Sequence, residues 1–463
     1  MTSYKTLFLG ASIVAASLLF SGCGSDSSSD TPSETNGTTP NETNTTIPNE
    51  SNETVATMAT SYASYRSGII SADTLVSYID NWEANRPADS NGRLVIIQAG
   101  ATSSGKFIKN NEASGVYVYQ IPATGACDPS YMRHDGVANI PGALLSGEYA
   151  DMMINQFHLD PANDTVVFAM GIGSTTLRDV VRSYWVLSYW GWPKEHIAFL
   201  NGSVDYNFAP SSDKSDYLAD APSTPPATPS SYTMKSMQTN NTDLQIYIDD
   251  MMKIASLSDQ SGYFIADARG TEEYSGATGS KTADKNCGPS HNEQCYSPYQ
   301  GHIRGAVDLP YTDLLIRDDQ SEDVNNDGNI TGADASFKFK SPADLEALFA
   351  AKGYQKGDKV VTYCRTGRKA TLVALVSYSV LNYDVAMYDG SWIQWGEMAN
   401  ATDVNGSEIL PAGNPWITMD ANYSVILSTT EPEYTQSAAP YAINPEATDA
   451  QNVKNEDLLY LGL

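Results

Sequence analysis

The feature that most constrains the fold is an internal repeat, because three short segments of the first half recur in the same order in the second half. The matched pairs are Asn139–Leu144 with Gly301–Ala306, Thr165–Met170 with the run ending at Cys364, and Ile197–Ser203 with Val385–Ser391. Such a repeat indicates two similar structural units. Strand-like and helix-like segments alternate in both copies, which predicts two tandem α/β domains, each a central parallel sheet flanked by helices.

The second copy has a cysteine between a predicted strand and a predicted helix. Val360–Tyr363 is a short, apolar, β-branched run typical of a buried strand, and Ala370–Leu381 has apolar residues at helical spacing. Cys364 therefore begins a strand-to-helix loop, whose amides and helix N-terminus favour a bound anion and a thiolate. In a chain of net charge −28, this loop holds three cations: Arg365, Arg368 and Lys369. The alternative is a buried structural cysteine, which rarely has so basic a loop.

Four motifs of the second half resemble those of rhodanese-type sulfurtransferases and occur in the family's order. They are Ile265–Arg269 followed by Glu273-Tyr274, then Gly301–Ala306, Cys364–Ala370 and Tyr388–Trp392. The resemblance implies two tandem rhodanese-like domains. Met170 holds the position equivalent to Cys364, and Gly171–Ser174 carries no cation, so the first domain is expected to be catalytically silent.

The resemblance implies transfer of sulfane sulfur from thiosulfate or a related small sulfur anion to cyanide or a thiol, through a persulfide on Cys364. No cofactor is needed for that chemistry. The substrate-binding loop would comprise Arg365, Thr366, Gly367, Arg368 and Lys369. Two departures leave the donor open: Lys369 replaces an arginine common in the family, and Glu273 stands where vertebrate two-domain enzymes carry a substrate-binding arginine.

Two other functions compete with this interpretation. Phosphatases and arsenate reductases of related fold need an arginine six residues after the cysteine, where this chain has Ala370. A non-enzymatic sulfur-relay or structural lipoprotein of a cell-envelope redox complex is the second alternative, and the nucleophile in its basic loop favours the enzyme. The acidic balance argues against nucleic acid, whose phosphates would be repelled. We expect a monomer.

The N-terminus reads as a lipoprotein signal peptide, residues 1–22. Lys5 precedes the apolar run Leu7–Phe20, and small residues precede Cys23, the expected lipidation site. An uncleaved anchor is the alternative, but the run is shorter than the ~20 residues a spanning helix needs. By resemblance, Gly24 favours the outer over the inner membrane of a bacterial cell envelope.

The rest of the chain divides by composition. Residues 23–58 are Ser-, Thr-, Asn- and Pro-rich and predict a disordered tether. The predicted domains are 59–230 and 231–415, the second with a helix over Asp243–Leu257 and with insertions at 275–300 and 317–340; an acidic extension, to which we assign no chemistry, covers 416–463.

The first insertion contains Cys287 and Cys295, which a disulfide would join in an exported protein. A metal site with His291 is the alternative, and it needs a further ligand. Cys127 is left over: it is either a buried, inert thiol or a second thiol near the site.

The second insertion contains a pattern typical of an EF-hand calcium loop. Oxygen-bearing side chains fall at loop positions 1, 3, 5 and 12, a glycine at 6, and a β-branched residue at 8. The expected Ca²⁺ ligands are Asp323, Asn325, Asp327, Asn329 (through its backbone) and Asp334. Aspartate at position 12 resembles dockerin modules, and a solvated turn is the alternative.

Overall fold

The computed structural model describes residues 60–64, 67–122, 131–135, 139–172, 174–210, 212–275, 301–316, 336–399 and 451–463. All of these lie in one compact unit, residues 45–463. The proposed lipidation site Cys23, the cysteines Cys127, Cys287 and Cys295, and the whole predicted calcium loop fall outside the described residues. Within the described part, no helix is long and apolar enough to cross a membrane.

The first half forms a five-stranded parallel sheet. Its order is β1 (Ile69–Ile70), β8 (Ile197–Leu200), β7 (Thr165–Met170), β2 (Leu94–Ala99) and β4 (Val116–Ile121). The central strands are buried on both faces, which is why they read as continuous apolar runs. Side chains on one face pack with α3 (Gly147–Gln156) and α4 (Ser174–Tyr189), and those on the other with α1 (Ala72–Asp80) and α5 (Val204–Asn207).

The second half repeats this arrangement strand for strand. Its order is β10 (Gln245–Ile246), β16 (Val385–Tyr388), β15 (Lys359–Tyr363), β11 (Tyr263–Asp267) and β12 (Ala306–Asp308), all parallel. One face packs with α8 (Pro342–Ala351), α9 (Ala370–Leu375) and the π-helix η11 (Val376–Val380). The other packs with α6 (Ile248–Ser256) and α10 (Ser391–Ala399). The predicted α/β class with two tandem parallel sheets is confirmed.

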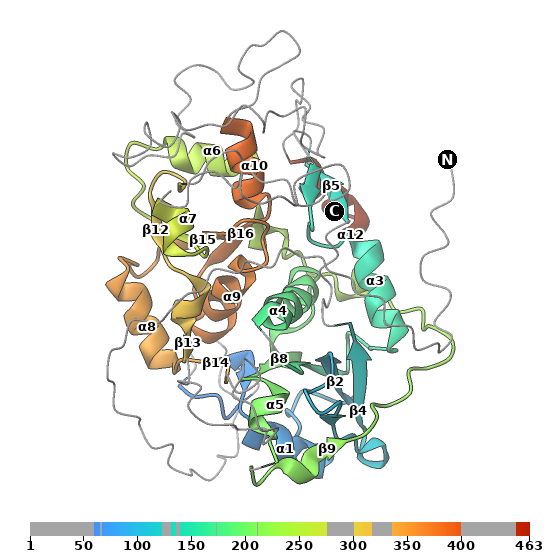
Figure 1. Ribbon diagram of the computed structural model, residues 1–463. Coiled ribbons are helices and arrows are strands. Elements are labelled where there is room, and N and C mark those ends of the chain that lie inside the picture. The colour runs from blue at the N-terminus through green and yellow to red at the C-terminus, as the bar shows by residue number, and fades with distance from the viewer. Residues whose placement is uncertain are drawn as a thin grey trace, which may run out of the picture. The chain divides into compact units, whose positions relative to one another are not determined.

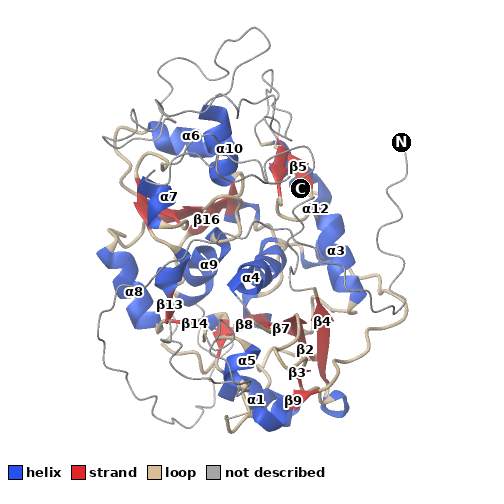
Figure 2. Cartoon of the chain, viewed as in Figure 1, coloured by secondary structure: helices blue, strands red, loops and turns tan. Residues whose placement is uncertain are grey.

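Helices α4 and α9 pack against each other between the two sheets (Figures 1 and 2). A single apolar cluster contains residues from both helices and from both sheets. Trp185 and Tyr378 meet edge to face with ring centroids 6.0 Å apart, and the hydroxyls of Tyr184 and Ser379 lie 2.7 Å apart. The two halves therefore share one hydrophobic core, and this core holds the two sheets in place relative to each other.

The remaining elements are short. They are α2 (Trp82–Asn85), β3 (Phe107–Ile108), η2 (Glu112–Ser114), β5 (Met132–His134), β6 (Asn139–Pro141), η3 (Lys194–His196), η4 (Ser215–Tyr217), β9 (Leu218–Ala219), η5 (Met234–Met237), η6 (Thr242–Leu244), α7 (Thr271–Ser275), η9 (Tyr311–Leu314), β13 (Leu315–Ile316), β14 (Lys338–Phe339) and α12 (Asn452–Leu461).

Three details of the predicted organisation are wrong. Residues 245–246 form the edge strand β10 beside β16, because tertiary pairing overrides helical spacing there, and the helix starts only at Ile248. Asn139–Leu144 does not occupy the place of Gly301–Ala306: β6 pairs with β5 in a separate hairpin, and β4 takes the position of β12. The predicted insertion 317–340 includes β14, which pairs with β13 as part of the fold.

The C-terminal helix α12 is part of the folded unit and contacts both halves. Asp457 is buried, forms an ion pair with Arg133 at 2.7 Å and accepts a hydrogen bond of 2.6 Å from the hydroxyl of Tyr189. Lys454 pairs with Asp243 of the second half at 2.7 Å. The acidic extension therefore ends in a helix that joins the two halves.

Candidate active site around Cys364

Cys364 follows β15 directly, at the carboxyl end of the second sheet, and is 1 % exposed. Its carbonyl accepts a hydrogen bond of 2.9 Å from the amide of Trp392, and the Arg365 carbonyl accepts one of 3.0 Å from Ile393. The loop is thereby held against the first turn of α10, which follows the neighbouring strand β16. Cys364 is the only free cysteine among the described residues. The carboxyl edge of a parallel sheet is where α/β proteins place ligands.

Gly367 is a position where this loop requires glycine. Its φ of +75° lies in the left-handed region, which a side chain disfavours. A Cβ atom there would also lie 2.6 Å from Asp389 Oδ1 and 2.9 Å from Arg182 Nη1. The loop can approach these two side chains only because Gly367 has no side chain of its own.

Glu273 on α7 lies between two cations of the loop. Its carboxylate forms an ion pair with Arg365 and lies 3.7 Å from Lys369 Nζ. Burial alone would raise the pKa of Glu273, but Arg365, Lys369 and Arg269 together hold that pKa well below its ordinary value of 4.5. Glu273 is therefore a carboxylate at neutral pH.

The third cation of the loop is paired by the first half of the chain. Arg368 forms an ion pair with Asp179, a fully buried residue of α4. All three cations are thus paired with carboxylates. One of these carboxylates, Asp179, belongs to α4 of the first half.

Arg182, one turn further along α4, also reaches the loop. Its guanidinium pairs with Asp389 at 2.6 Å, donates to the Gly142 carbonyl at 3.0 Å and lies 3.4 Å from the Gly367 carbonyl. The other oxygen of Asp389 accepts a 2.7 Å hydrogen bond from the amide of Leu144. Arg182 and Asp389 are 1 % and 4 % exposed, so this pair is a buried joint between the halves beside the loop.

The Asp-Ala-Arg motif, residues 267–269, packs against the start of α10 beside the loop. Asp267 and Arg269 are fully buried and form an ion pair at 2.5 Å, and the Arg269 guanidinium carbon lies 4.4 Å from the centroid of the Trp392 ring. In the Gly-His-Ile motif, the amide of Ile303 donates a 3.0 Å hydrogen bond to the hydroxyl of Tyr363. Both motifs therefore brace the strand and helix that flank Cys364.

The structure brings the predicted loop residues, Cys364 to Lys369, together at one sheet edge, with Thr366 half-buried among them. Sequence reasoning missed Asp179 and Arg182. Their signal was present, because both are charged residues three apart in a helix whose neighbours Val180, Val181 and Tyr184 are apolar. The predicted disulfide, metal and lipid positions all lie outside the described residues. No group of potential metal ligands occurs within the part of the chain that the structure describes.

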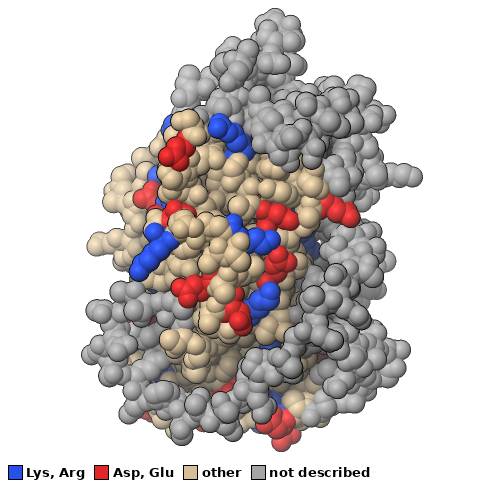
Figure 3. All heavy atoms as spheres, turned by 90° about the vertical axis from the view of Figure 1, so that its left-hand side faces the viewer, with Lys and Arg blue, Asp and Glu red and all other residues tan. Residues whose placement is uncertain are grey.

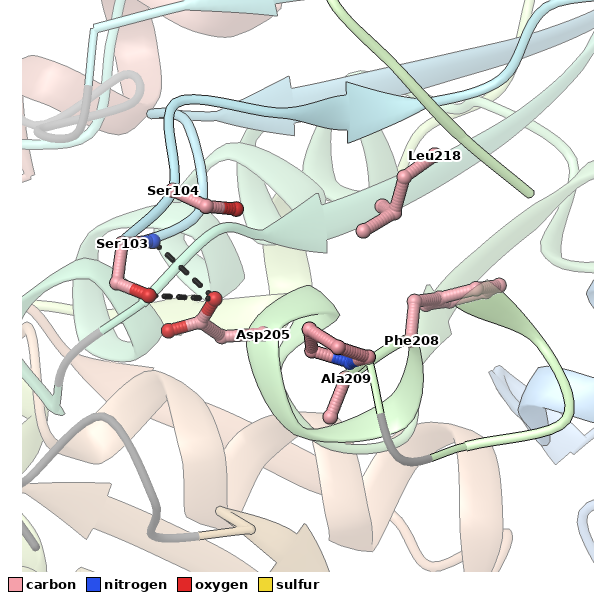
Figure 4. A pocket seen from close by; sticks show the side chains of 7 residues that line it. Ser103, Ser104, Asp205, Phe208, Ala209 and Leu218 are labelled. Atoms are coloured by element: carbon pink, nitrogen blue, oxygen red, sulfur yellow. Dashed lines mark hydrogen bonds between the residues drawn. The ribbon is translucent and has the colours of Figure 1, made fainter. Parts of the chain in front are cut away.

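At the equivalent edge of the first sheet, the loop after β2 occupies the space beside the strand end. Met170 ends β7 fully buried, and a Cβ added to Gly171 would lie 2.3 Å from the Ala101 carbonyl oxygen. Asp205 accepts hydrogen bonds of 3.1 and 3.0 Å from the amide and hydroxyl of Ser103, which holds the loop after β2 over this edge (Figure 4). A cavity of about 90 Å³ remains beside these residues.

On the face shown in Figure 3, Lys and Arg side chains are interspersed with Asp and Glu, and neither sign forms a continuous patch. The cations of the loop are instead largely buried beside their partners: the Arg365 and Arg368 side chains are 9 % and 13 % exposed. The candidate site is therefore a local, enclosed charge cluster.

The chain is similar to known proteins. Residues 251–398 match the family of the rhodanese-like domain. A Haloferax volcanii protein named "Putative thiosulfate sulfurtransferase" is 28 % identical over 73 % of this chain and 96 % of its own length. The mouse thiosulfate sulfurtransferase is 37 % identical over 20 % of this chain and 26 % of its own length.

Among solved structures, the Tum1 protein of Saccharomyces cerevisiae covers 75 % of this chain and 96 % of its own, at 16 % identity and a TM-score of 0.47. The family match lies on the second sheet, and the first sheet repeats the strand order of the second. The described chain is thus an α/β protein with two parallel sheets of the same strand order, and its residues 251–398 are similar to the rhodanese-like domain.

Proposed function

We propose that this protein is a sulfurtransferase that moves sulfane sulfur from thiosulfate or a related donor to a thiol or cyanide through a persulfide on Cys364. The observation that carries the proposal is the placement of Cys364 at the end of β15, in a loop with three cations at a helix start. A thiolate is the nucleophile in such chemistry, and cations beside it stabilise the anionic states that form. The matched family and the names of the similar proteins support the same reaction class.

In the first step the Cys364 thiolate attacks the outer sulfur of thiosulfate. A sulfur–sulfur bond forms to Cys364, the bond to the sulfonate sulfur breaks, and sulfite leaves with the electron pair. The product is an anionic persulfide. In the second step a nucleophilic acceptor attacks the outer sulfur of the persulfide, and the Cys364 thiolate returns. Two displacements at one sulfur atom make this ping-pong covalent catalysis.

The loop residues have distinct proposed roles. Arg365, Arg368 and Lys369 orient the donor and balance the charge that builds up on sulfur, while Thr366 and Gly367 shape the loop around it. The Arg182–Asp389 pair acts as a positioning device, because it contacts Gly367 without reaching the reacting atoms. The first domain contributes Asp179 and Arg182 and has Met170, not a cysteine, at the equivalent strand end, which supports a catalytically silent role for it.

The test is a steady-state assay of thiocyanate formation from thiosulfate and cyanide. Cys364→Ser should abolish turnover, whereas Met170→Leu, a volume-conserving change in the equivalent strand end, should leave it within about threefold. Comparable losses in both variants would contradict a single active domain. No turnover by the wild type with thiosulfate, polysulfide or mercaptopyruvate would favour the non-enzymatic relay or structural lipoprotein.

We also propose that the second insertion binds one Ca²⁺ through Asp323, Asn325, Asp327, Asn329 and Asp334, a proposal that rests on their spacing alone. Calorimetric titration of chelator-treated protein should show one site that Asp323→Ala with Asp327→Ala removes. No heat at millimolar Ca²⁺ would make the segment a solvated turn.

The envelope location is a further proposal from sequence: a bacterial lipoprotein anchored through Cys23, at the outer rather than the inner membrane. A fatty-acid analogue should label the wild type in cells and spare Cys23→Ala. An unlabelled wild type would contradict the anchor. In the same exported setting, a Cys287–Cys295 disulfide should disappear on reduction in a peptide map, and free thiols before reduction would contradict it.

A further inference from the structure

The charges around Cys364 come close to cancelling. Three loop cations, Arg365, Arg368 and Lys369, pair with two carboxylates, Glu273 and Asp179. These five side chains together sum to one positive charge, since three positive charges meet two negative ones. The neighbouring buried pairs, Arg182 with Asp389 and Arg269 with Asp267, each sum to zero.

That single positive charge matches one negative charge, and the Cys364 thiolate supplies it. A donor that enters beside the thiolate thus meets a cluster without excess positive charge. The site is enclosed, because Cys364 is 1 % exposed and Arg365 and Glu273 are each 7 % exposed. Every additional negative charge brought into such a site loses solvation without gaining an unpaired cation.

From this balance we infer that Glu273 is a specificity-determining residue that limits the charge of the sulfur donor, so that singly charged donors are used in preference to the thiosulfate dianion. The inference rests on the proposed sulfurtransferase function and deepens it. Glu273 occupies the centre of the cluster, where its carboxylate contacts two of the three cations. A dianion has to compete with that carboxylate for Arg365 and Lys369, whereas a monoanion needs less positive charge.

A matched pair of donors separates charge from shape. Methanethiosulfonate resembles thiosulfate with one oxygen replaced by a methyl group, and it carries one negative charge instead of two. In both cases the Cys364 thiolate bonds to the outer sulfur while the bond to the oxidised sulfur breaks. The leaving groups are methanesulfinate and sulfite, each departing with its electron pair, and the products are the same persulfide. Intrinsic reactivities differ, so the informative quantity is the change in the donor ratio between variants.

The experiment measures kcat/KM for both donors, with cyanide as acceptor and the uncatalysed rate subtracted, in the wild type, Glu273→Gln and Glu272→Gln. Glu273→Gln keeps the size and a hydrogen-bonding oxygen but removes the charge. We expect it to raise the thiosulfate-to-methanethiosulfonate ratio of kcat/KM by about tenfold, mainly through a lower KM for thiosulfate, since one charge has been removed within a few ångströms of the donor site. Glu272→Gln is the control, because Glu272 is the exposed neighbour.

A second variant keeps the test informative if Glu273→Gln does not fold. Asp179→Asn removes the other carboxylate from the opposite side of the loop and should shift the ratio in the same direction. An unchanged ratio in both Glu273→Gln and Asp179→Asn, with both donors still turned over, would overturn the inference and leave the proposed function intact. If the wild type uses neither these donors nor any other sulfane donor, the proposed function itself fails. An equal shift in Glu272→Gln would also overturn the inference, since long-range charge would then suffice.

Discussion

The two halves of this chain present the same sheet edge in two chemical states. At the end of β15, Cys364 stands beside paired cations in a loop opened by Gly367. At the end of β7, Met170 is buried and the Ala101 carbonyl lies over Gly171. Strand order and helix placement are common to both. The fold therefore supplies a place at the sheet edge, and the charged side chains around it decide whether that place can do chemistry.

The joint between the halves shows the same contrast. On one side the amide of Leu144 donates to Asp389 at 2.7 Å, two residues before the N-cap of α3. On the other the amide of Phe339 donates to Asn201 at 2.8 Å, two residues before the N-cap of α8. The contacts are related by the repeat, yet only the one beside Cys364 has a charged acceptor paired with an arginine. The first half thus retains the structural joint without its charge.

The largest expected effect comes from moving the thiol between the two edges. In the double variant Cys364→Ser with Met170→Cys, the first half gains a cysteine at the equivalent strand end. Activity should stay at the level of Cys364→Ser, roughly 1,000-fold or more below the wild type, because residues 171–176 supply no cation and Ala101 fills the edge. The same thiocyanate assay measures this. Recovery of even a few per cent of wild-type turnover would show that a thiol alone makes the edge active.

The Arg182–Asp389 contact and the Asn201–Phe339 contact should differ in their effects on stability and on catalysis. Arg182→Met removes one partner of a buried ion pair and should lower the free energy of unfolding by about 3 kcal/mol, because Asp389 is left as a buried charge. It should also lower kcat more than it raises KM, since the contact with the Gly367 carbonyl positions the loop. Denaturant unfolding and steady-state kinetics measure the two effects.

Asn201→Ala is the matched change at the uncharged contact between Asn201 and Phe339. It removes one neutral hydrogen-bond acceptor and should cost about 1 kcal/mol of stability while kcat and KM stay at wild-type values. If both variants lower kcat to the same degree, the charged joint has no special role in positioning the loop.

The smallest expected effect is a pH dependence of stability. Because the folded-state pKa of Glu273 lies below its ordinary value of 4.5, its ion pairs stabilise the fold fully above that pH. That stabilisation is lost progressively as the pH falls below 4.5. The difference in unfolding free energy between the wild type and Glu273→Gln should therefore be constant near neutrality and shrink in acid. A difference independent of pH down to 3 would mean that Glu273 is not ionised in the fold.

Much of this arrangement could be predicted from local sequence. The strands ending at Met170 and Cys364, the repeat of Ile197–Ser203 in Val385–Ser391, and the basic loop all follow from residues adjacent in the chain. The strands β7 and β15 are buried in parallel sheets, so their sequences are continuous apolar runs that are easy to recognise. The predictions that concerned the tether, the first insertion, the calcium loop and the lipid site stay predictions.

The parts that sequence did not reveal depend on tertiary contacts. Asp179 meets Arg368 across 189 positions of the chain, and no local pattern encodes that pairing. Glu273 was noted only as a departure from related enzymes, and its contact with both Arg365 and Lys369 appears once α7 folds over the loop. Strand β10 was missed because two residues gain their conformation from pairing with β16.

The most direct test of the account is the location of the transferred sulfur. Purified protein incubated with excess thiosulfate or polysulfide and no acceptor should gain the mass of one sulfur atom, and peptide mass spectrometry should place it on Cys364. Cyanide should then remove it and restore the original mass. No added sulfur with any sulfane donor, or sulfur on a cysteine other than Cys364, would contradict the claim that the second sheet edge is the active site.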